Sequence, residues 1–330
     1  MIVTFYSSVL NHQIEFCDEM YKRFGNDFKF VSTMEIEKQR EDLKYYEYDR
    51  PYRIKMHRSE KEWDEGNVLF LNSDVVILGV NMPLQLRERL KKGKVTFLYR
   101  ERIFKEPPSA YKYLRNLAYF VKEYWRFRKK PFYVLAASAY TLQDHKSLGM
   151  FKDKTFSWGY FPPCKIYDEA VLMSKKESEK VNLFWAGRFI NLKKVSFVIK
   201  VAERLREQNI NFCVDMAGTG ELEDEIKKLV EEKKLQDYVI FHGAMPQEEV
   251  RKFMERANIY LFTSDRREGF GAVLTEAMNS GCAVVASATA GSTKLLINDG
   301  ENGLIYEKDS SQELCEKVLC LVKNQDIAKS

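Results

Sequence analysis

No apolar run in the sequence approaches the roughly 20 residues that a membrane-spanning helix needs. The N-terminal stretch MIVTFYSSVLNHQ is apolar for only a few residues, and it lacks a basic start and a small-residue cleavage site. We therefore interpret it as a first strand and not as a signal peptide. These absences predict a cytoplasmic protein, and we expect any contact with a membrane to be peripheral, at its inner face.

Metal-binding and redox motifs are absent too. The chain has no DxD triplet, no HExxH and no CxxC, and its six cysteines are scattered through strand-like and helix-like runs. We expect buried free thiols in a reducing compartment, no required divalent metal and no other cofactor. A net charge of +5 on 330 residues is too small for a dedicated nucleic-acid binder, although it suits an anionic substrate or an anionic lipid surface.

Glycine and proline are distributed unequally. Ten of the sixteen glycines follow position 180, whereas seven of the eight prolines precede it. The pair Pro162 and Pro163 ends one series of elements, and the charged stretch MSKKESEK precedes the next strand. Since 330 residues exceed one typical core, we predict two domains, residues 1–165 and 166–330, with a linker that extends to about 180.

Short β-rich runs alternate with amphipathic stretches in the second half. We expect strands over 181–187, 211–218, 238–243, 257–264 and 282–287, and helices over 194–207, 221–234, 247–256 and 271–280. The first half alternates similarly, from IVTFYSS to FYVLAAS. Apolar strands alternating with helices predict parallel sheets covered on both faces. We expect an α/β protein with two Rossmann-like domains facing a cleft, and ligands at the loops that follow the strands.

The first such loop of the second half is AGRFINLKK, in which Arg188 and Lys193 follow Gly187. Two cations at one turn can neutralise a diphosphate, arginine as a planar fork and lysine as a point charge. Lys193 and Lys194 could instead be the solvated start of a helix. A cationic first turn opposes the helix dipole, however, and this favours an anionic ligand.

Two further loops offer weaker signals. AGTGELED places Gly218 where the backbone can approach a ligand, although the same residues also suit a helix cap. His242 and Gly243 end a strand before a tight turn. Because a lone histidine in a loop is more often structural than catalytic, we assign His242 only a contact with a nucleobase.

The segment EGFGAVLTE sets two glutamates around a glycine-rich bend that leads into an apolar helix. The bend comprises Gly269, Phe270, Gly271 and Ala272. Its backbone N–H groups would be the unsatisfied donors of a helix N-terminus, which attracts phosphate. Carboxylates that pointed at this phosphate would repel it, so we expect each to face hydroxyl groups, Glu276 those of a ribose and Glu268 those of a hexose.

These segments together resemble the retaining GT-B glycosyltransferases of family GT4, the glycosyl transferases group 1. The resemblance rests on the E-x7-E pattern in EGFGAVLTE, on GCAVVAS and DGENGLIYE downstream, and on GRFINLKK upstream, and it covers roughly residues 181–325. It implies a GT-B fold, in which Arg188 and Lys193 bind the diphosphate of a nucleotide sugar, Glu268 binds the sugar and Glu276 binds the ribose.

The resemblance also implies the reaction. A UDP- or GDP-sugar would donate a hexosyl unit to an acceptor hydroxyl, with retention at the anomeric carbon and without a metal ion. A saccharide or lipid-linked saccharide would be the acceptor, in bacterial surface polysaccharide or glycolipid assembly. No carboxylate nucleophile is evident, so we favour a front-face mechanism in which the leaving phosphate helps to deprotonate the acceptor.

The first half resembles the family less. Relatives carry a glycine pair after the first strand, where this chain has SSVLNHQIEF, and a histidine after a middle strand, where it has TFLYRERIF. We assign His12 and Glu101 a contact with the acceptor or the sugar. Arg100 is an alternative to Glu101, and an ordinary salt bridge is an equal interpretation of either.

Residues 122–130, KEYWRFRKK, gather five cations and three aromatic side chains around one glutamate. One interpretation is the solvated end of a helix over 110–128, with its aromatic side chains partly in the core. The other is an interfacial patch that holds the protein beside an anionic membrane. The sequence favours the first, since it shows no clean amphipathic face.

Two other functions fit the same fold. A sugar-nucleotide epimerase would need no acceptor, but it would need an acid and a base in the cleft. A noncatalytic sugar-nucleotide binding protein would hold the donor without turnover. No nucleic-acid partner is expected for any of the three.

Overall fold

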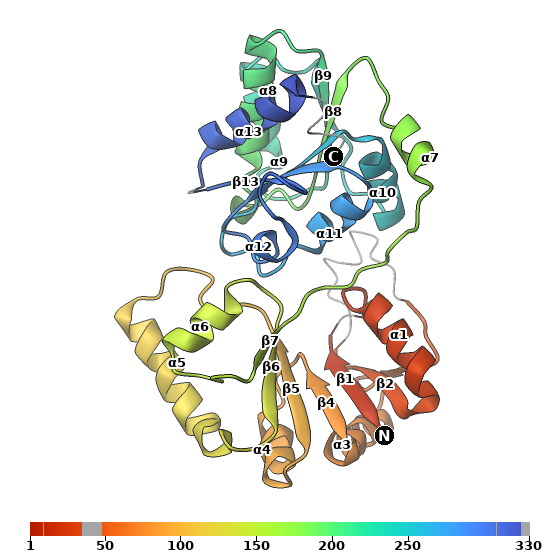
Figure 1. Cartoon of the computed structure of the whole chain (residues 1–330), viewed down its shortest axis with the longest axis vertical. Helices are drawn as coiled ribbons and strands as arrows, with labels where there is room; N and C mark the ends of the chain where they lie inside the picture. The colour runs from red at the N-terminus through yellow and green to blue at the C-terminus, as the bar shows by residue number, and fades with distance from the viewer. Residues whose placement is uncertain (9, 35–47, 308, 325–330) are drawn as a thin grey trace. The chain divides into compact units, whose positions relative to one another are not determined.

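The computed structural model describes residues 1–8, 10–34, 48–307 and 309–324 (Figure 1). The chain divides into two compact units, and the division falls between Pro163 and Cys164. Each unit is built around its own parallel sheet.

The first unit contains a seven-stranded sheet in the order β3-β2-β1-β4-β5-β6-β7, in which every pair is parallel. Its strands are β1 Val3–Ser7, β2 Phe28–Ser32, β3 Arg53–Lys55, β4 Val75–Leu78, β5 Val95–Arg100, β6 Phe132–Ala136 and β7 Thr155–Ser157. The helices are α1 Ile14–Phe24, α3 Glu60–Asn72, α4 Pro83–Lys91, α5 Ala110–Glu123 and α6 Thr141–Ser147.

The second unit contains a six-stranded sheet in the order β10-β9-β8-β11-β12-β13, again parallel. Its strands are β8 Val181–Ala186, β9 Phe212–Ala217, β10 Val239–Phe241, β11 Ile259–Phe262, β12 Ala283–Ser287 and β13 Leu304–Tyr306. The helices are α7 Glu169–Ser174, α8 Val195–Glu207, α9 Glu223–Glu232, α10 Gln247–Arg256, α11 Ala272–Asn279, α12 Thr293–Leu296 and α13 Ser311–Lys323.

Both sheets start at a central strand, extend to one side and then cross to the other. In the second unit the crossing sets β11 beside β8. Open α/β sheets bind ligands at the carboxyl edge where the order of strands reverses, which is the edge from which the loops after β8 and β11 extend. The order of strands alone thus selects the loops after β8 and β11.

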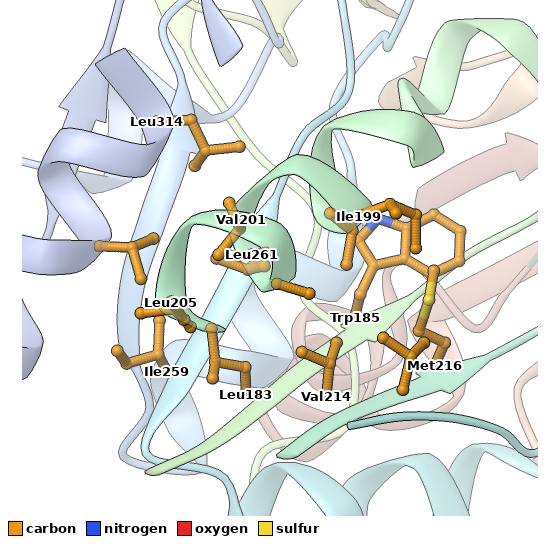
Figure 2. Close-up of a cluster of buried hydrophobic side chains, with 14 of the residues drawn as sticks. Leu183, Trp185, Ile199, Val201, Leu205, Val214, Met216, Ile259, Leu261 and Leu314 are labelled. Atoms are coloured by element: carbon orange, nitrogen blue, oxygen red, sulfur yellow. The ribbon is translucent and has the colours of Figure 1, made fainter. Parts of the chain in front are cut away.

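The core of the second unit explains why its strands are continuously apolar. Leu183 and Trp185 face the helices α8 and α13, in the cluster shown in Figure 2. Their neighbours Phe184 and Ala186 point to the opposite face and join a second cluster with residues of α10 and α11. Both faces of the sheet are buried, as the period of two along a strand requires.

The predicted α/β fold class is confirmed, and the expected elements of the second half lie within a few residues of those observed. Three short strands were not predicted: β3, β7 and β13, each of three residues. The expected helix over 110–128 is wrong at its end, because α5 stops at Glu123 and the chain continues as a 3₁₀ turn, Trp125–Phe127. The expected linker contains the helix α7.

The prediction of buried thiols is only partly right. All six cysteines are free, but Cys164 and Cys320 are exposed. Cys164 lies at the division between the units, and Cys320 lies on the outward side of α13. In the described part of the chain, no helix combines the length and apolar character that crossing a membrane requires.

Candidate functional site

The loops after β8 and β11 meet through Lys193 and Glu268. The Lys193 ammonium donates to the Glu268 carboxylate. Both side chains are largely buried, at 15% and 16% exposed. The Lys193 carbonyl also accepts a hydrogen bond from the Thr263 hydroxyl at 2.6 Å. Lys193 is therefore not the solvated start of a helix; it lies in a 3₁₀ turn before α8 and faces the predicted sugar-binding carboxylate.

Three predicted glycines lie side by side at the ends of neighbouring strands. The Gly187 N–H donates to the Ala217 carbonyl at 3.0 Å, and the Gly218 N–H donates to the Gly243 carbonyl at 2.8 Å. A Cβ on Gly218 would lie 1.8 Å from the Gly187 carbonyl oxygen, and its φ of +130° is one that other residues rarely adopt. Gly218 is therefore required for the strand ends to approach, and Arg188 projects, exposed, from the turn beside them.

The bend that leads into α11 is fixed by its neighbours. Gly271 caps the helix with a φ of +89°, and a Cβ there would lie 2.4 Å from the Phe262 ring. The carbonyls of Glu268 and Phe270 accept hydrogen bonds from the segment after β12, at 3.2 and 3.1 Å. In the first turn of α11 the Leu274 N–H donates to the Gly271 carbonyl at 3.0 Å, and the N–H groups of Ala272 and Val273 precede any intrahelical acceptor. The side chain of Phe270 is buried and anchors the bend.

Glu276 lies in α11 and is 8% exposed. Its carboxylate accepts a hydrogen bond from the Gln247 amide at the start of α10. Burial raises the pKa of Glu276, although the nearby Arg251 charge and the Gln247 hydrogen bond act in the opposite direction. A buried carboxylate of this kind gains from any additional hydrogen-bond donors, such as hydroxyl groups.

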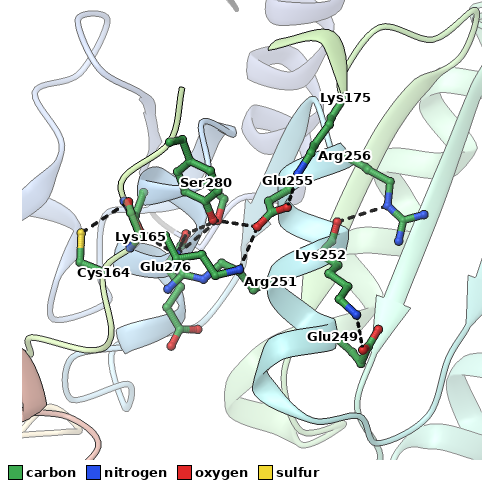
Figure 3. A network of polar contacts seen from close by, with 12 residues as sticks. Cys164, Lys165, Lys175, Glu249, Arg251, Lys252, Glu255, Arg256, Glu276 and Ser280 are labelled. Atoms are coloured by element: carbon green, nitrogen blue, oxygen red, sulfur yellow. Dashed lines mark hydrogen bonds and ion pairs between the residues drawn. The ribbon is translucent and has the colours of Figure 1, made fainter. Parts of the chain in front are cut away.

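A polar network on α10 holds Glu276 in place (Figure 3). Arg251 donates to the Glu276 carbonyl at 3.1 Å and to the Asn279 side-chain oxygen at 2.8 Å. The backbone of Lys165 in turn bonds both ways with the Asn279 amide, at 3.0 and 2.9 Å. α10, α11 and the start of the chain segment after the division are thereby tied together around the Glu276 backbone.

Glu255 of α10 binds the segment from Lys165 to Lys175. Its carboxylate accepts from the ammonium of Lys165 at 3.0 Å, from that of Lys175 at 2.8 Å and from the Tyr167 hydroxyl at 2.9 Å. Burial alone would raise its pKa, but the hydrogen bonds from the two lysines and the tyrosine lower it to about 2. Glu255 is therefore ionised over the whole ordinary pH range.

His242 lies at the end of β10 and is paired with an acid. Its Nε2 is 2.6 Å from the Asp215 carboxylate, and its ring centroid is 4.4 Å from that of Phe253. These contacts fix the orientation of the imidazole, and they leave its Nδ1 edge as the one directed away from Asp215. Asp215 was not predicted from the sequence, where it is an isolated polar residue within an apolar strand.

In the first unit, Tyr160 brings the predicted His12 and Glu101 together. The His12 ring stacks on Tyr160 with centroids 4.6 Å apart, and the Tyr160 hydroxyl donates to the Glu101 carboxylate at 2.6 Å. Glu101 also forms an ion pair with Lys105 at 2.9 Å, so the salt-bridge interpretation applies to it as well. Tyr160 was not predicted; its only sequence signal is its position just before the proline pair.

Comparison with known protein families finds a match to the second unit. The family model described as Glycosyl transferases group 1 matches residues 172–330. This region is a group 1 glycosyltransferase domain. It contains every residue predicted to bind the donor, and only His12 and Glu101 lie outside it.

Curated relatives of the glycosyltransferase domain match over part of their length. An uncharacterised glycosyltransferase of Methanocaldococcus jannaschii is 31% identical over 146 residues, which are 44% of this chain and 39% of that protein. The poly(glycerol-phosphate) α-glucosyltransferase of Bacillus subtilis is 29% identical over 186 residues, 56% of this chain and 26% of that protein. The chain thus matches less than half the length of either relative.

Solved structures match both units. HepE of Anabaena in complex with UDP has a TM-score of 0.70 at 16% identity, with 100% of this chain and 93% of that one covered. WaaG, a glycosyltransferase involved in lipopolysaccharide biosynthesis, has a TM-score of 0.62 at 17% identity, with 99% and 92% covered. At these identities the likeness establishes the fold, which is GT-B.

Among the described residues, no group of side chains is arranged to bind a metal ion. No three of their His, Cys, Asp and Glu side chains are close enough together to hold an ion. The loops after β8 and β11 carry the cations Arg188, Lys193, Arg266 and Arg267 beside the acids Asp265 and Glu268.

Proposed function

We propose that this protein is a retaining glycosyltransferase that moves a hexosyl unit from a nucleoside-diphosphate sugar to an acceptor hydroxyl. The observation that carries the proposal is the contact of Lys193 with Glu268 at the strand crossing, beside the first turn of α11. A sugar diphosphate needs a cation to bind its phosphates and a hydrogen-bond acceptor to bind the hydroxyl groups of its sugar. Lys193 and Glu268 can supply these two groups.

The ion pair itself suggests how the donor binds. An arriving diphosphate offers the Lys193 ammonium two anionic groups. The ammonium then leaves the Glu268 carboxylate, or is shared between that carboxylate and the phosphate. The released Glu268 oxygen can then accept a hydroxyl of the sugar. Arg188 and the N–H groups of α11 would neutralise the charge that grows on the leaving phosphate.

The reaction would exchange one bond at the anomeric carbon for another. The bond from that carbon to the phosphate oxygen breaks, and a bond to the acceptor oxygen forms on the same face. The acceptor proton passes to the leaving phosphate oxygen, so no carboxylate nucleophile and no metal ion are needed. Fixed cations and N–H groups are most effective here because they need no reorganisation as charge develops.

The nucleoside end of the donor would lie at Glu276 and His242. Glu276 is buried, and its carboxylate has Gln247 as a hydrogen-bond donor, so ribose hydroxyls would complete its solvation. His242, oriented by Asp215, would face the base. Uracil is the base we favour, because HepE was crystallised with UDP and with UDP-glucose; a GDP-sugar is the alternative.

The acceptor assignment rests on the first unit. His12, Tyr160 and Glu101 form a stacked and hydrogen-bonded group at the carboxyl edge of its sheet, and an aromatic face with adjacent polar groups suits a saccharide. Similarity to a poly(glycerol-phosphate) α-glucosyltransferase and to a glycosyltransferase involved in lipopolysaccharide biosynthesis supports a proposed role in bacterial surface glycan assembly.

One experiment separates the three candidate functions. The protein is incubated with labelled UDP- and GDP-sugars, with and without a panel of saccharide and lipid-linked acceptors, in EDTA. Acceptor-dependent release of the nucleotide, at a rate that EDTA does not lower, supports the proposal. An isomerised donor would indicate an epimerase, and donor binding without any turnover across the panel would indicate a noncatalytic binding protein.

A further inference from the structure

Helix α5, Ala110–Glu123, lies at the periphery of the first unit (Figure 1). Its inward row packs with Phe104, Leu148 and Met150 in a small cluster of its own. The inward row consists of Tyr113, Leu117, Phe120 and Tyr124. This row accounts for the attachment of α5 to its unit, and it leaves the remaining apolar residues of the helix without a place in the core.

Most of those remaining residues form one exposed stripe, whereas Tyr119, 45% exposed, lies on another side of the helix. Tyr111, Leu114, Val121 and Trp125 are 72%, 60%, 50% and 47% exposed. The spacings of Tyr111, Leu114 and Val121 align them along one side of α5, with the exposed Ala118 between them, and Trp125 follows in the 3₁₀ turn after the helix. Scattered exposed apolar residues are ordinary, but a contiguous row of large ones marks an interaction surface.

Positive charge is also concentrated in this segment. Residues 110–130 contain seven lysines and arginines and one acid, Glu123, whereas the whole chain has a net charge of only +5. Glu123 is buried against Arg87, so it does not offset the exposed cations. Arg115 and Lys122 are exposed on α5, and at 100° per residue they form a row adjacent to the apolar stripe; Arg126 is exposed in the 3₁₀ turn that follows the helix.

We propose that this face of α5 docks the protein on the surface of an anionic lipid bilayer. An apolar stripe beside a basic row is the pattern of a helix that lies in the plane of the membrane interface, with its apolar side chains below the headgroups. The phosphates of the headgroups would pair with the basic row. A second copy of the chain is a poorer occupant, because it would set one basic row against another.

The structure places this surface differently from the sequence. The segment 122–130 alone shows no clean amphipathic face, and its Phe127 is buried. The apolar stripe starts at Tyr111 and ends at Trp125, so it becomes visible only when the buried and exposed sides of α5 are distinguished. The inference does not depend on the proposed chemistry, since none of these residues belongs to the donor or acceptor groups.

Co-sedimentation with vesicles tests the proposal. The full chain is mixed with vesicles of phosphatidylcholine alone or of phosphatidylcholine with phosphatidylglycerol. We expect binding to the anionic vesicles only, weakening as salt is added, because screening shortens the reach of the basic row. Lys122→Glu with Arg126→Glu should lower the partition coefficient roughly thirtyfold or more, and Leu114→Ser with Val121→Ser should abolish stable binding.

Matched variants control for general effects of exposure and charge. Val68→Ser with Leu84→Ser removes the same two side-chain types from positions 58% and 73% exposed on α3 and α4. Lys61→Glu with Lys228→Glu makes the same change in net charge at exposed sites elsewhere. Both controls should bind anionic vesicles as the unchanged protein does. Circular dichroism and urea unfolding, followed for every variant, report that the fold is intact.

Three results would overturn the proposal. The first is binding to neutral vesicles as strong as to anionic ones, and the second is binding that the α5 variants and the control variants lose equally. The third is a lipid-free dimer, seen by light scattering, that Leu114→Ser with Val121→Ser converts to a monomer while vesicles bind neither form. That outcome would assign the stripe to a second copy of the chain.

Discussion

Lys193 and Glu268, 75 residues apart in the sequence, form an ion pair with side chains only 15% and 16% exposed. The pair joins the loops that follow β8 and β11. These two strands are neighbours because the chain crosses the sheet between β10 and β11. In the proposed function the two partners bind different parts of one donor, so their variants should differ in kind.

Lys193→Gln should weaken the binding of UDP itself, by roughly tenfold to a hundredfold, because it removes a charged hydrogen bond to phosphate. Glu268→Gln should leave UDP binding within a few-fold of the unchanged protein, yet lower the rate of transfer on the order of a hundredfold. Isothermal titration with UDP and a nucleotide-release assay give the two numbers. Lys252→Gln and Glu249→Gln, which alter an exposed pair, serve as controls. Equal losses of UDP affinity in both site variants would contradict the division of roles.

Glu276→Gln tests the ribose assignment. A carboxylate accepts two hydroxyl hydrogen bonds, whereas the amide offers one acceptor oxygen, so the variant should lose most of the preference for UDP over 2′-deoxy-UDP. Folding should not suffer, because burial raises the pKa of Glu276 and the neutral side chain avoids that cost. The affinities of the unchanged protein and of the variant for UDP and 2′-deoxy-UDP, measured under the same conditions, test the assignment. An unchanged ratio in the variant would place the ribose elsewhere.

Gly218→Ala should be among the most damaging single changes in the second unit. The added Cβ would meet the Gly187 carbonyl oxygen at 1.8 Å, at a φ of +130°. We expect a loss of about 3 kcal/mol or more in the free energy of unfolding. Gly300→Ala is the matched control, with a φ of +83° and open space around it, and should cost about 1 kcal/mol. Urea unfolding monitored by tryptophan fluorescence compares them, and similar losses would show that the close approach at Gly218 is unimportant.

Glu255→Gln should destabilise the protein by about 2 kcal/mol near neutral pH, a figure already reduced because its lysine partners are nearly half exposed. The pKa of Glu255 is lowered from 4.5 to about 2 in the folded protein. Its contribution is therefore fully present above about 4.5, and is lost as the pH falls toward about 2. The difference in stability between the unchanged protein and the variant should shrink over that interval.

Glu249→Gln on the same helix provides the comparison for Glu255. Glu249 pairs with Lys252, and both side chains are about half exposed, so its removal should leave the free energy of unfolding nearly unchanged. Urea unfolding of both variants between neutral and acidic pH measures the contrast. A Glu255→Gln variant as stable as Glu249→Gln would show that the carboxylate does not fasten the segment after the division.

The sequence could predict that Lys193 and Glu268 come together at the candidate donor site, because the parts of this site are local. A glycine at a strand end, a cation in the following turn and a bend before a helix are all written in consecutive residues, and parallel strands bring their ends to one edge. Asp215 was missed because its contact with His242 depends on register: Asp215 pairs with Ile240, two residues before His242, so the two side chains share a face of the sheet. No local pattern encodes that pairing.

Other omissions have the same origin. β3, β7 and β13 are too short for a period of two to appear, and they become strands only by pairing with a longer neighbour. Tyr160 gains its role from the distant His12 and Glu101. The exposed stripe of α5 could not be recognised, because in sequence its apolar residues merge with those of the buried row.

The most direct test of the account is titration of the full chain with UDP, UMP and uridine, for the unchanged protein and for Lys193→Gln. The account predicts that UDP binds more tightly than UMP, that uridine binds least, and that the variant loses the gain contributed by the second phosphate. If UDP and UMP bind equally, or if the variant keeps the full difference between them, then Lys193 does not hold a diphosphate and the proposed donor site is wrong.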